Sequence, residues 1–186
     1  GESGRGFALA FNGTISNFLE ARTSLKDSGH SFSTRADTEV LACCIADGYR
    51  ETKDYFEAIG KCMDLLDGSF SLVLITDKGE LYGARDPVGY KPLCLGMNES
   101  RGLYVMASES VAEDVLDARN IGEIRPGEVV RISGGGIERQ IVRSSPRHAM
   151  CMFEYVYFSR PDSIIDGVGV YDARLRLGRN LARTWP

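Results

Sequence analysis

The sequence predicts an α+β domain in which antiparallel strands form sheets that helices cover. Three observations predict this class. Two helical patterns follow one another before any long β-rich run, the apolar period changes from helical to alternating after Gly68, and short turns join the later strands. A doubly wound nucleotide-binding fold is disfavoured, because its strands and helices alternate one for one.

The first third of the chain indicates one strand and three helices. An apolar strand over Gly6–Phe11 is expected to end at Asn12-Gly13, a common turn dipeptide. A first helix follows from the spacing of Ile15, Phe18, Leu19 and Leu25. Asp37 is a favoured N-cap residue and predicts the start of a second helix. The clearest amphipathic pattern predicts a third helix from Tyr55 to Leu66.

The remainder of the chain is predicted to be rich in strands. Strands are expected at residues 69–76, 80–85, 93–97, 103–107, 128–132 and 137–142. Asp77-Lys78-Gly79 and Pro126-Gly127 have the composition of tight turns. Ser108-Glu109-Ser110 is typical of a helix entrance, and a helical pattern from Val170 to Leu181 closes the chain.

Composition limits the functional classes. The chain has 186 residues, of which 43% are hydrophobic and 26% charged, with a net charge of -4. This suits one medium-sized folded domain rather than a disordered chain. Lys and Arg are scattered, so no nucleic-acid partner is expected. No apolar run approaches the ~20 residues that cross a bilayer, and no signal segment opens the chain, so we expect no membrane partner and a cytoplasmic location.

The cysteines do not form a metal-binding pattern. Five cysteines and two histidines are present, without any C-x-x-C pair. We therefore expect reduced thiols and no metal in this chain. Cys44 and Cys62 lie on apolar helix faces and are interpreted as small core residues. Phosphate-loop, dinucleotide-binding and serine-hydrolase motifs are absent from the sequence.

Two short motifs carry both a structural and a chemical interpretation. Asn12-Gly13 is typical of a turn, yet a side-chain amide beside an accessible glycine N–H also supplies the two neutral donors of an oxyanion hole. Asp37 is typical of a helix cap, yet its carboxylate could also bind a substrate ammonium group. The residues alone leave both alternatives open.

Taken together, seven segments resemble the glutaminase domain of class II glutamine amidotransferases, which are N-terminal nucleophile hydrolases. The segments are Phe11–Gly13, Ala36–Leu41, Asp67–Ser71, Arg85–Leu93, Ala107–Ser110, Arg125–Glu128 and Phe153–Ser163. The last is particular to the branch whose second domain is a phosphoribosyltransferase. The resemblance implies a four-layer αββα sandwich of two antiparallel sheets, incomplete at the N-terminus.

The resemblance also implies an activity and its residues. Such domains hydrolyse glutamine to glutamate and ammonia through an N-terminal cysteine. Asn12 and Gly13 would hold the oxyanion, Asp37 would bind the α-ammonium group, and the turn at Asp86 would be structural. Ammonia would pass to a phosphoribosyltransferase domain of the same polypeptide, which uses phosphoribosyl pyrophosphate with Mg²⁺ in the first step of purine synthesis. A homo-oligomer is expected.

The sequence departs from this family at its start, where Gly1-Glu2-Ser3 leaves no nucleophilic cysteine. We therefore expect an internal piece of a longer enzyme, inactive alone. In this interpretation residues 1–150 are a glutaminase domain lacking its N-terminal part, and residues 151–186 lead into the phosphoribosyltransferase domain. Cys151 is a candidate ligand of an iron–sulfur cluster that cysteines of the second domain would complete.

Two alternatives share the early motifs. One is a sister amidotransferase that aminates a sugar phosphate or aspartate. The other is a catalytically inactive domain that binds an amino acid as a regulator.

Overall fold

The computed structural model describes residues 6–185, so Gly1-Glu2-Ser3 lies outside the described residues. The chain forms two compact units. The first contains the described residues up to Lys91 together with Ile124–Ala149, and the second contains Pro92–Glu123 together with the described residues from Met150 onwards. No helix among residues 6–185 is both long enough and apolar enough to cross a membrane.

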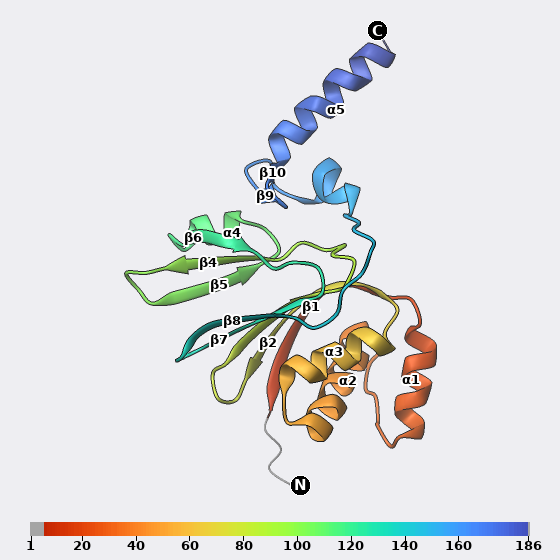
Figure 1. Ribbon diagram of the computed structural model, residues 1–186. Coiled ribbons are helices and arrows are strands. Elements are labelled where there is room, and N and C mark those ends of the chain that lie inside the picture. The colour runs from red at the N-terminus through yellow and green to blue at the C-terminus, as the bar shows by residue number, and fades with distance from the viewer. Residues whose placement is uncertain (1–5, 186) are drawn as a thin grey trace. The chain divides into compact units, whose positions relative to one another are not determined.

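The first unit is one antiparallel sheet with three helices (Figure 1). Its elements are β1 (Phe7–Ile15), α1 (Phe18–Asp27), α2 (Asp37–Thr52), α3 (Tyr55–Leu65), β2 (Gly68–Thr76), β3 (Leu81–Arg85), β7 (Glu128–Ser133) and β8 (Gly136–Ile141). The strand order is β1-β2-β3-β7-β8. In the part of the chain that the structure describes, β1 is therefore an edge strand.

Helices α2 and α3 build the core of this unit against the sheet. Alternate residues of β2, Phe70, Leu72 and Leu74, are buried against them. The two helices pack closely where Gly48 meets Ala58, since a Cβ on Gly48 would lie 2.9 Å from the Ala58 Cα. Helical and alternating periods therefore place their apolar residues at one interface, as the sequence predicts.

The second unit has a smaller antiparallel sheet and a long final helix (Figure 1). Its elements are β4 (Cys94–Asn98), β5 (Leu103–Ala107), α4 (Val111–Val115), β6 (Arg119–Glu123), the π-helix η1 (Glu154–Phe158), β9 (Ile164–Ile165), β10 (Val168–Gly169) and α5 (Val170–Thr184). The sheet order is β5-β4-β6, and β9 pairs with β10.

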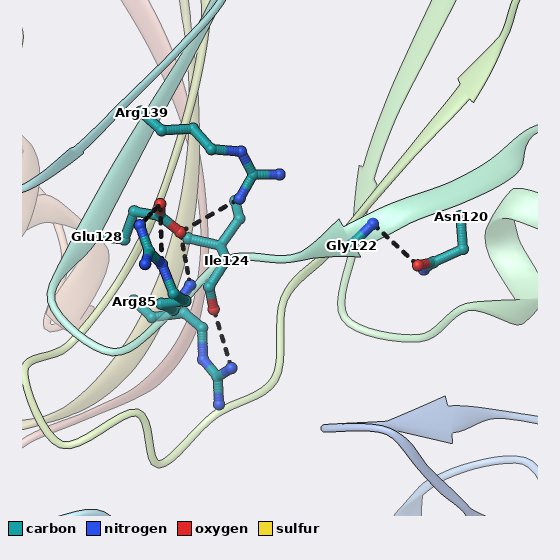
Figure 2. Close-up of polar contacts among 7 residues, drawn as sticks. Arg85, Asn120, Gly122, Ile124, Glu128 and Arg139 are labelled. Carbon is teal, nitrogen blue, oxygen red and sulfur yellow. Dashed lines mark hydrogen bonds and ion pairs between the residues drawn. The ribbon is translucent and has the colours of Figure 1, made fainter.

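Strand β6 is absent from the sequence prediction. Its residues Arg119-Asn120-Ile121-Gly122-Glu123 are mostly polar and include a glycine, which disfavours a strand. The Asn120 side-chain oxygen accepts the Gly122 N–H at 3.0 Å (Figure 2). Pairing with β4 places this segment in the sheet, across an irregularity at Leu95/Gly96.

The helix predicted to start at Ser108-Glu109-Ser110 is present, and Ser110 is the N-cap residue of α4. The predicted side-chain capping is wrong, because the Ser110 side chain makes no capping hydrogen bond to α4. Instead, Glu109 accepts the Arg160 N–H at 2.8 Å and the Ser163 hydroxyl at 2.6 Å. The Ser110 hydroxyl accepts the Ile164 N–H at 2.9 Å. Two of the segments that carry the family resemblance thus bind one another within the second unit.

Candidate functional site

Strand β1 continues through Asn12-Gly13 rather than ending there. Asn12 pairs with Ser71, Gly13 with Phe70, and the strand reaches Ile15. The predicted turn at Asn12-Gly13 and the placement of Ile15 in a helix are therefore wrong. Pairing with a nine-residue partner strand outweighs the local turn preference of the dipeptide.

Gly13 occupies a position that a side chain cannot share. A Cβ built on it would lie 2.2 Å from the Ser69 carbonyl oxygen and 2.7 Å from the Phe70 Cα. Its φ of 155° also falls outside the range that other residues favour. The close approach of β2 to β1 thus requires glycine at this point.

The hydrogen bonds of Phe70 reveal which way the Gly13 N–H faces. Phe70 donates its N–H to Asp86 Oδ2 at 3.0 Å and accepts the Asp86 N–H at 2.8 Å, so both its backbone polar groups face β3. In an antiparallel ladder such a residue forms a non-hydrogen-bonded pair with its other neighbour. Gly13 is that neighbour. Its N–H therefore faces the outer edge of β1, away from β2.

Asp37 lies at the same strand edge. Ile15, two residues beyond Gly13, also belongs to a non-hydrogen-bonded pair, opposite Gly68. Its N–H donates to Asp37 Oδ2 at 2.8 Å. Among residues 6–185 the structure shows no hydrogen bond to Asp37 Oδ1. One carboxylate oxygen thus anchors helix α2 to β1, and the other keeps its capacity to accept a hydrogen bond.

The predicted helix cap at Asp37 is wrong by one position. Ala36 is the N-cap of α2, and Asp37 is its first helical residue. Its carboxylate caps no N–H of α2 and instead binds Ile15, which lies 22 residues away in the sequence. A carboxylate in the first helical turn is also stabilised by the helix dipole.

Asn12 supplies a polar side chain beside Gly13. Its neighbour Phe11 packs against the core, so strand alternation turns Asn12 to the opposite face of the sheet. Asn12 is half-buried, and its amide forms no hydrogen bond among the described residues. The structure thus brings Gly13 and Asp37 to one edge and places the Asn12 amide next to that edge, but shows no hydrogen bond between Asn12 and Asp37.

Glu39 organises the loop that leads into Asp37, a role that the sequence analysis did not assign. Its two oxygens accept the Ser33 N–H and hydroxyl at 2.7 and 3.0 Å, and the Thr34 N–H and hydroxyl at 2.9 and 2.7 Å. These bonds, led by that from the Thr34 hydroxyl, lower the pKa of Glu39 to about 2. The sequence contains a signal for this role, because Ser33 and Thr34 precede Glu39 by six and five residues.

The described residues do not offer a metal site. Among residues 6–185 no group of three or more His, Cys, Asp or Glu side chains is arranged to hold a metal ion. Cys151 is buried, and no such group of described side chains surrounds it. Because a cluster normally takes four thiolates, these residues do not fit an iron–sulfur centre by themselves.

Among residues 6–185, the Gly13 N–H faces away from the sheet ladder, the Asn12 amide has no hydrogen bond, and a carboxylate lies at the same strand edge, an arrangement that fits acyl-transfer chemistry. The family model "Glutamine amidotransferase domain" matches residues 2–113. The chain therefore belongs to the glutamine amidotransferase domain family.

Individual relatives agree with this assignment. The amidophosphoribosyltransferase of Pyrococcus horikoshii is 41% identical over 179 residues, which cover 96% of this chain and 38% of the relative. That of Bacillus subtilis is 38% identical and 36% covered. The solved glutamine phosphoribosylpyrophosphate amidotransferase of B. subtilis, complexed with ADP and GMP, superposes with a TM-score of 0.88 at 35% identity, over 98% of this chain and 39% of that one.

These relatives confirm the expected N-terminal nucleophile hydrolase fold and family. The chain spans less than two fifths of the length of the Pyrococcus relative, at 38%. The structural match extends over nearly the whole chain, and so includes the second unit and its final helix.

Proposed function

We propose that this chain is the glutamine-hydrolysing part of an amidophosphoribosyltransferase. In the full protein an N-terminal cysteine thiolate attacks the side-chain amide carbon of glutamine. The carbonyl oxygen gains negative charge, and ammonia leaves when the tetrahedral adduct collapses to a thioester. Water then releases glutamate from the thioester.

Gly13 and Asn12 serve this reaction as donors to the oxyanion. The Gly13 N–H is supported in this role because it faces away from the sheet ladder, and the Asn12 amide because it has no partner among the described residues. Donors fixed before the reaction need no reorganisation as charge develops on the substrate. A close-packed β2 behind Gly13 holds that donor in place.

Asp37 binds the α-ammonium group of glutamine. Its Oδ2 is held by the Ile15 N–H, so the side chain is fixed before substrate arrives. Its Oδ1 retains the capacity to accept a charge-assisted hydrogen bond. Because this carboxylate lies beyond Gly13 on the same edge, it can orient the amide end of the substrate toward the oxyanion donors.

The remaining steps belong to the full protein. Ammonia passes to a phosphoribosyltransferase domain of the same polypeptide and displaces pyrophosphate from phosphoribosyl pyrophosphate, in the first step of purine synthesis. Mg²⁺ bound with that substrate would offset its negative charge. The full enzyme is a cytoplasmic homo-oligomer. Residues 151–186 connect the glutaminase domain to its partner domain, and a cluster involving Cys151 would require cysteines from outside this chain.

The single observation that carries this function is the Gly13 N–H facing the same edge as Asp37. It is tested with the full natural protein by measuring glutamate release from glutamine and pyrophosphate release from phosphoribosyl pyrophosphate. We expect both, with the second dependent on glutamine or ammonia.

The two alternatives predict different results in the same assays. Glutamate release coupled to a sugar phosphate or aspartate, without pyrophosphate release from phosphoribosyl pyrophosphate, would assign a sister amidotransferase. Glutamine binding by calorimetry without hydrolysis would assign a regulatory domain.

A further inference from the structure

The Asp86 carboxylate accepts four backbone N–H groups. Its Oδ1 accepts the N–H groups of Val88 and Gly89 at 2.8 and 2.9 Å. Its Oδ2 accepts those of Tyr90 and Phe70 at 3.1 and 3.0 Å. The residue is fully buried. Three donors shape its own turn, and the fourth belongs to β2, 16 residues earlier in the chain.

This fourth bond replaces a bond of the β-ladder. Asp86 follows the last residue of β3 and faces Phe70, and its N–H donates to the Phe70 carbonyl as the ladder requires. The Asp86 carbonyl should return the bond, but it accepts the N–H groups of Gly127 at 2.9 Å and Gly89 at 3.0 Å instead. The side-chain carboxylate therefore takes the place of the carbonyl in the ladder. Phe70 of β2 stays hydrogen-bonded to Asp86, one residue beyond the end of β3.

Arg85 also fixes this turn. Its guanidinium donates to the Ile124 carbonyl at 2.9 Å (Figure 2) and to the Gly89 carbonyl at 2.6 Å. Gly89 thus has its carbonyl bound by Arg85 and its N–H bound by Asp86. The carboxylate of Asp86 is consequently held by its own turn, and this fixes the acceptor of the Phe70 N–H.

We propose that Asp86 is a positioning residue for glutamine hydrolysis, acting through Phe70 on Gly13. By holding both polar groups of Phe70 toward β3, it leaves the Gly13 N–H facing the open edge of β1. It also fixes the β2 backbone, which lies so close to Gly13 that this position leaves no room for a Cβ. This inference rests on the proposed function and extends it to a residue that does not touch substrate.

The test uses the full natural protein and its Asp86→Asn variant. Asparagine has nearly the same size as aspartate, but its NH2 group replaces one acceptor oxygen with a donor that would face backbone N–H groups. We expect kcat for glutamate release to fall about 10- to 100-fold, because a small displacement of an oxyanion donor has that effect. KM for glutamine should stay within about threefold, because Asp37 is untouched. The aldehyde analogue of glutamine, to which the cysteine thiol adds, should lose affinity in proportion to kcat.

Glu128→Gln is the matched control. Glu128 is equally buried in the same unit, and it accepts the Arg125 N–H at 2.8 Å and pairs with Arg139 at 3.3 Å, but it does not contact β1 or β2 in these interactions (Figure 2). It should lower the thermal midpoint and leave kcat unchanged. Equal loss of kcat in both variants would mean a general packing effect and overturn the inference.

Other outcomes are equally decisive. A folded Asp86→Asn protein with normal kcat overturns the inference while leaving the proposed function intact. A wild-type protein that does not hydrolyse glutamine overturns both. If Asp86→Asn does not fold, Asp86→Glu keeps the charge and displaces the carboxylate by one methylene. Normal kcat in that variant also overturns the inference, and a selective loss of kcat supports it.

Discussion

The N–H of Ile15 donates to Asp37 Oδ2 at 2.8 Å and thereby fastens the start of helix α2 to the end of strand β1. This bond connects the two parts of the candidate site. It uses one oxygen of the carboxylate and leaves the negative charge for the substrate ammonium group that we propose it binds. In this proposal one side chain serves both the fold and substrate binding, and a substitution can separate the two.

Asp37→Asn should impair glutamine binding without disrupting the fold. The asparagine oxygen can still accept the Ile15 N–H, but the charge that pairs with the substrate ammonium is lost. Losing such a charge-assisted contact costs about 1.5–3 kcal/mol, so we expect KM for glutamine to rise about 10- to 100-fold in the full protein. Steady-state kinetics measures this. Asp47→Asn, in the same helix but bound to His30 and Arg50, is the control. An unchanged KM would remove Asp37 from the substrate site.

Gly13→Ala should damage both stability and activity. The added Cβ would lie 2.2 Å from the Ser69 carbonyl oxygen, so the two strands must separate. Overpacking of this kind costs about 1–3 kcal/mol. We expect a lower thermal midpoint and loss of glutamate release in the full protein. Gly6→Ala, just before the same strand and with no atom within 4 Å of its Cβ, should change neither. Normal hydrolysis by Gly13→Ala would contradict the oxyanion role.

Helices α2 and α3 were predictable because each has a one-sided apolar period, whereas the pattern that predicted α1 included Ile15 of β1 and the exposed Leu19. The period of α3 places Phe56, Ile59 and Cys62 in the core, as the structure confirms. For the candidate site, the sequence indicated the residue types but not their conformations. Local preference indicates a turn at Asn12-Gly13 and a cap at Asp37, whereas distant partners, β2 and Ile15, decide both conformations.

Other features could not be predicted from the sequence, because they depend on which residues of two paired strands lie opposite each other. Asp86 is recognisable as a turn residue, but its bond to Phe70 follows from the pairing of β2 with β3. Likewise Glu109 has the appearance of a helix cap until the Arg160–Ile164 segment meets it. Long-range pairing supplies partners that no local pattern reveals.

Glu39 should make stability depend on acid. Its pKa is about 2 in the folded protein against an ordinary value of 4.5. A lowered folded-state pKa gives stability that is fully present above the unfolded value and is lost as the pH falls toward the folded one. We therefore expect the thermal midpoint of the full protein to fall between pH 4.5 and about 2, and Glu39→Gln to weaken that dependence. Glu57→Gln, in the first turn of α3, is the control. Identical pH profiles for Glu39→Gln and wild type would contradict this.

Cys44 and Cys62 should be able to form a disulfide between α2 and α3. The helices run antiparallel past the Gly48–Ala58 contact, and each cysteine lies one turn from it in the same direction. The hydrogen bond between the two thiols lowers the pKa of Cys44 and raises that of Cys62. An azodicarboxamide oxidant, which takes up the two thiol hydrogens as the S–S bond forms, should cross-link them, and peptide mass mapping after alkylation measures the product.

Cys44→Ala and Cys62→Ala should each abolish that cross-link. Cys43→Ala should not, although Cys43 is adjacent in sequence, because it belongs to a different face of α2 and burial raises the pKa of its thiol. Both thiols of the pair are buried, so the reaction should be slow in the native protein and faster under mild destabilisation. The packing of Gly48 on Ala58 requires Cys44 and Cys62 to face each other. A disulfide from Cys43 to Cys62 would contradict this, and so would free thiols that persist at Cys44 and Cys62 under conditions that open the helices locally.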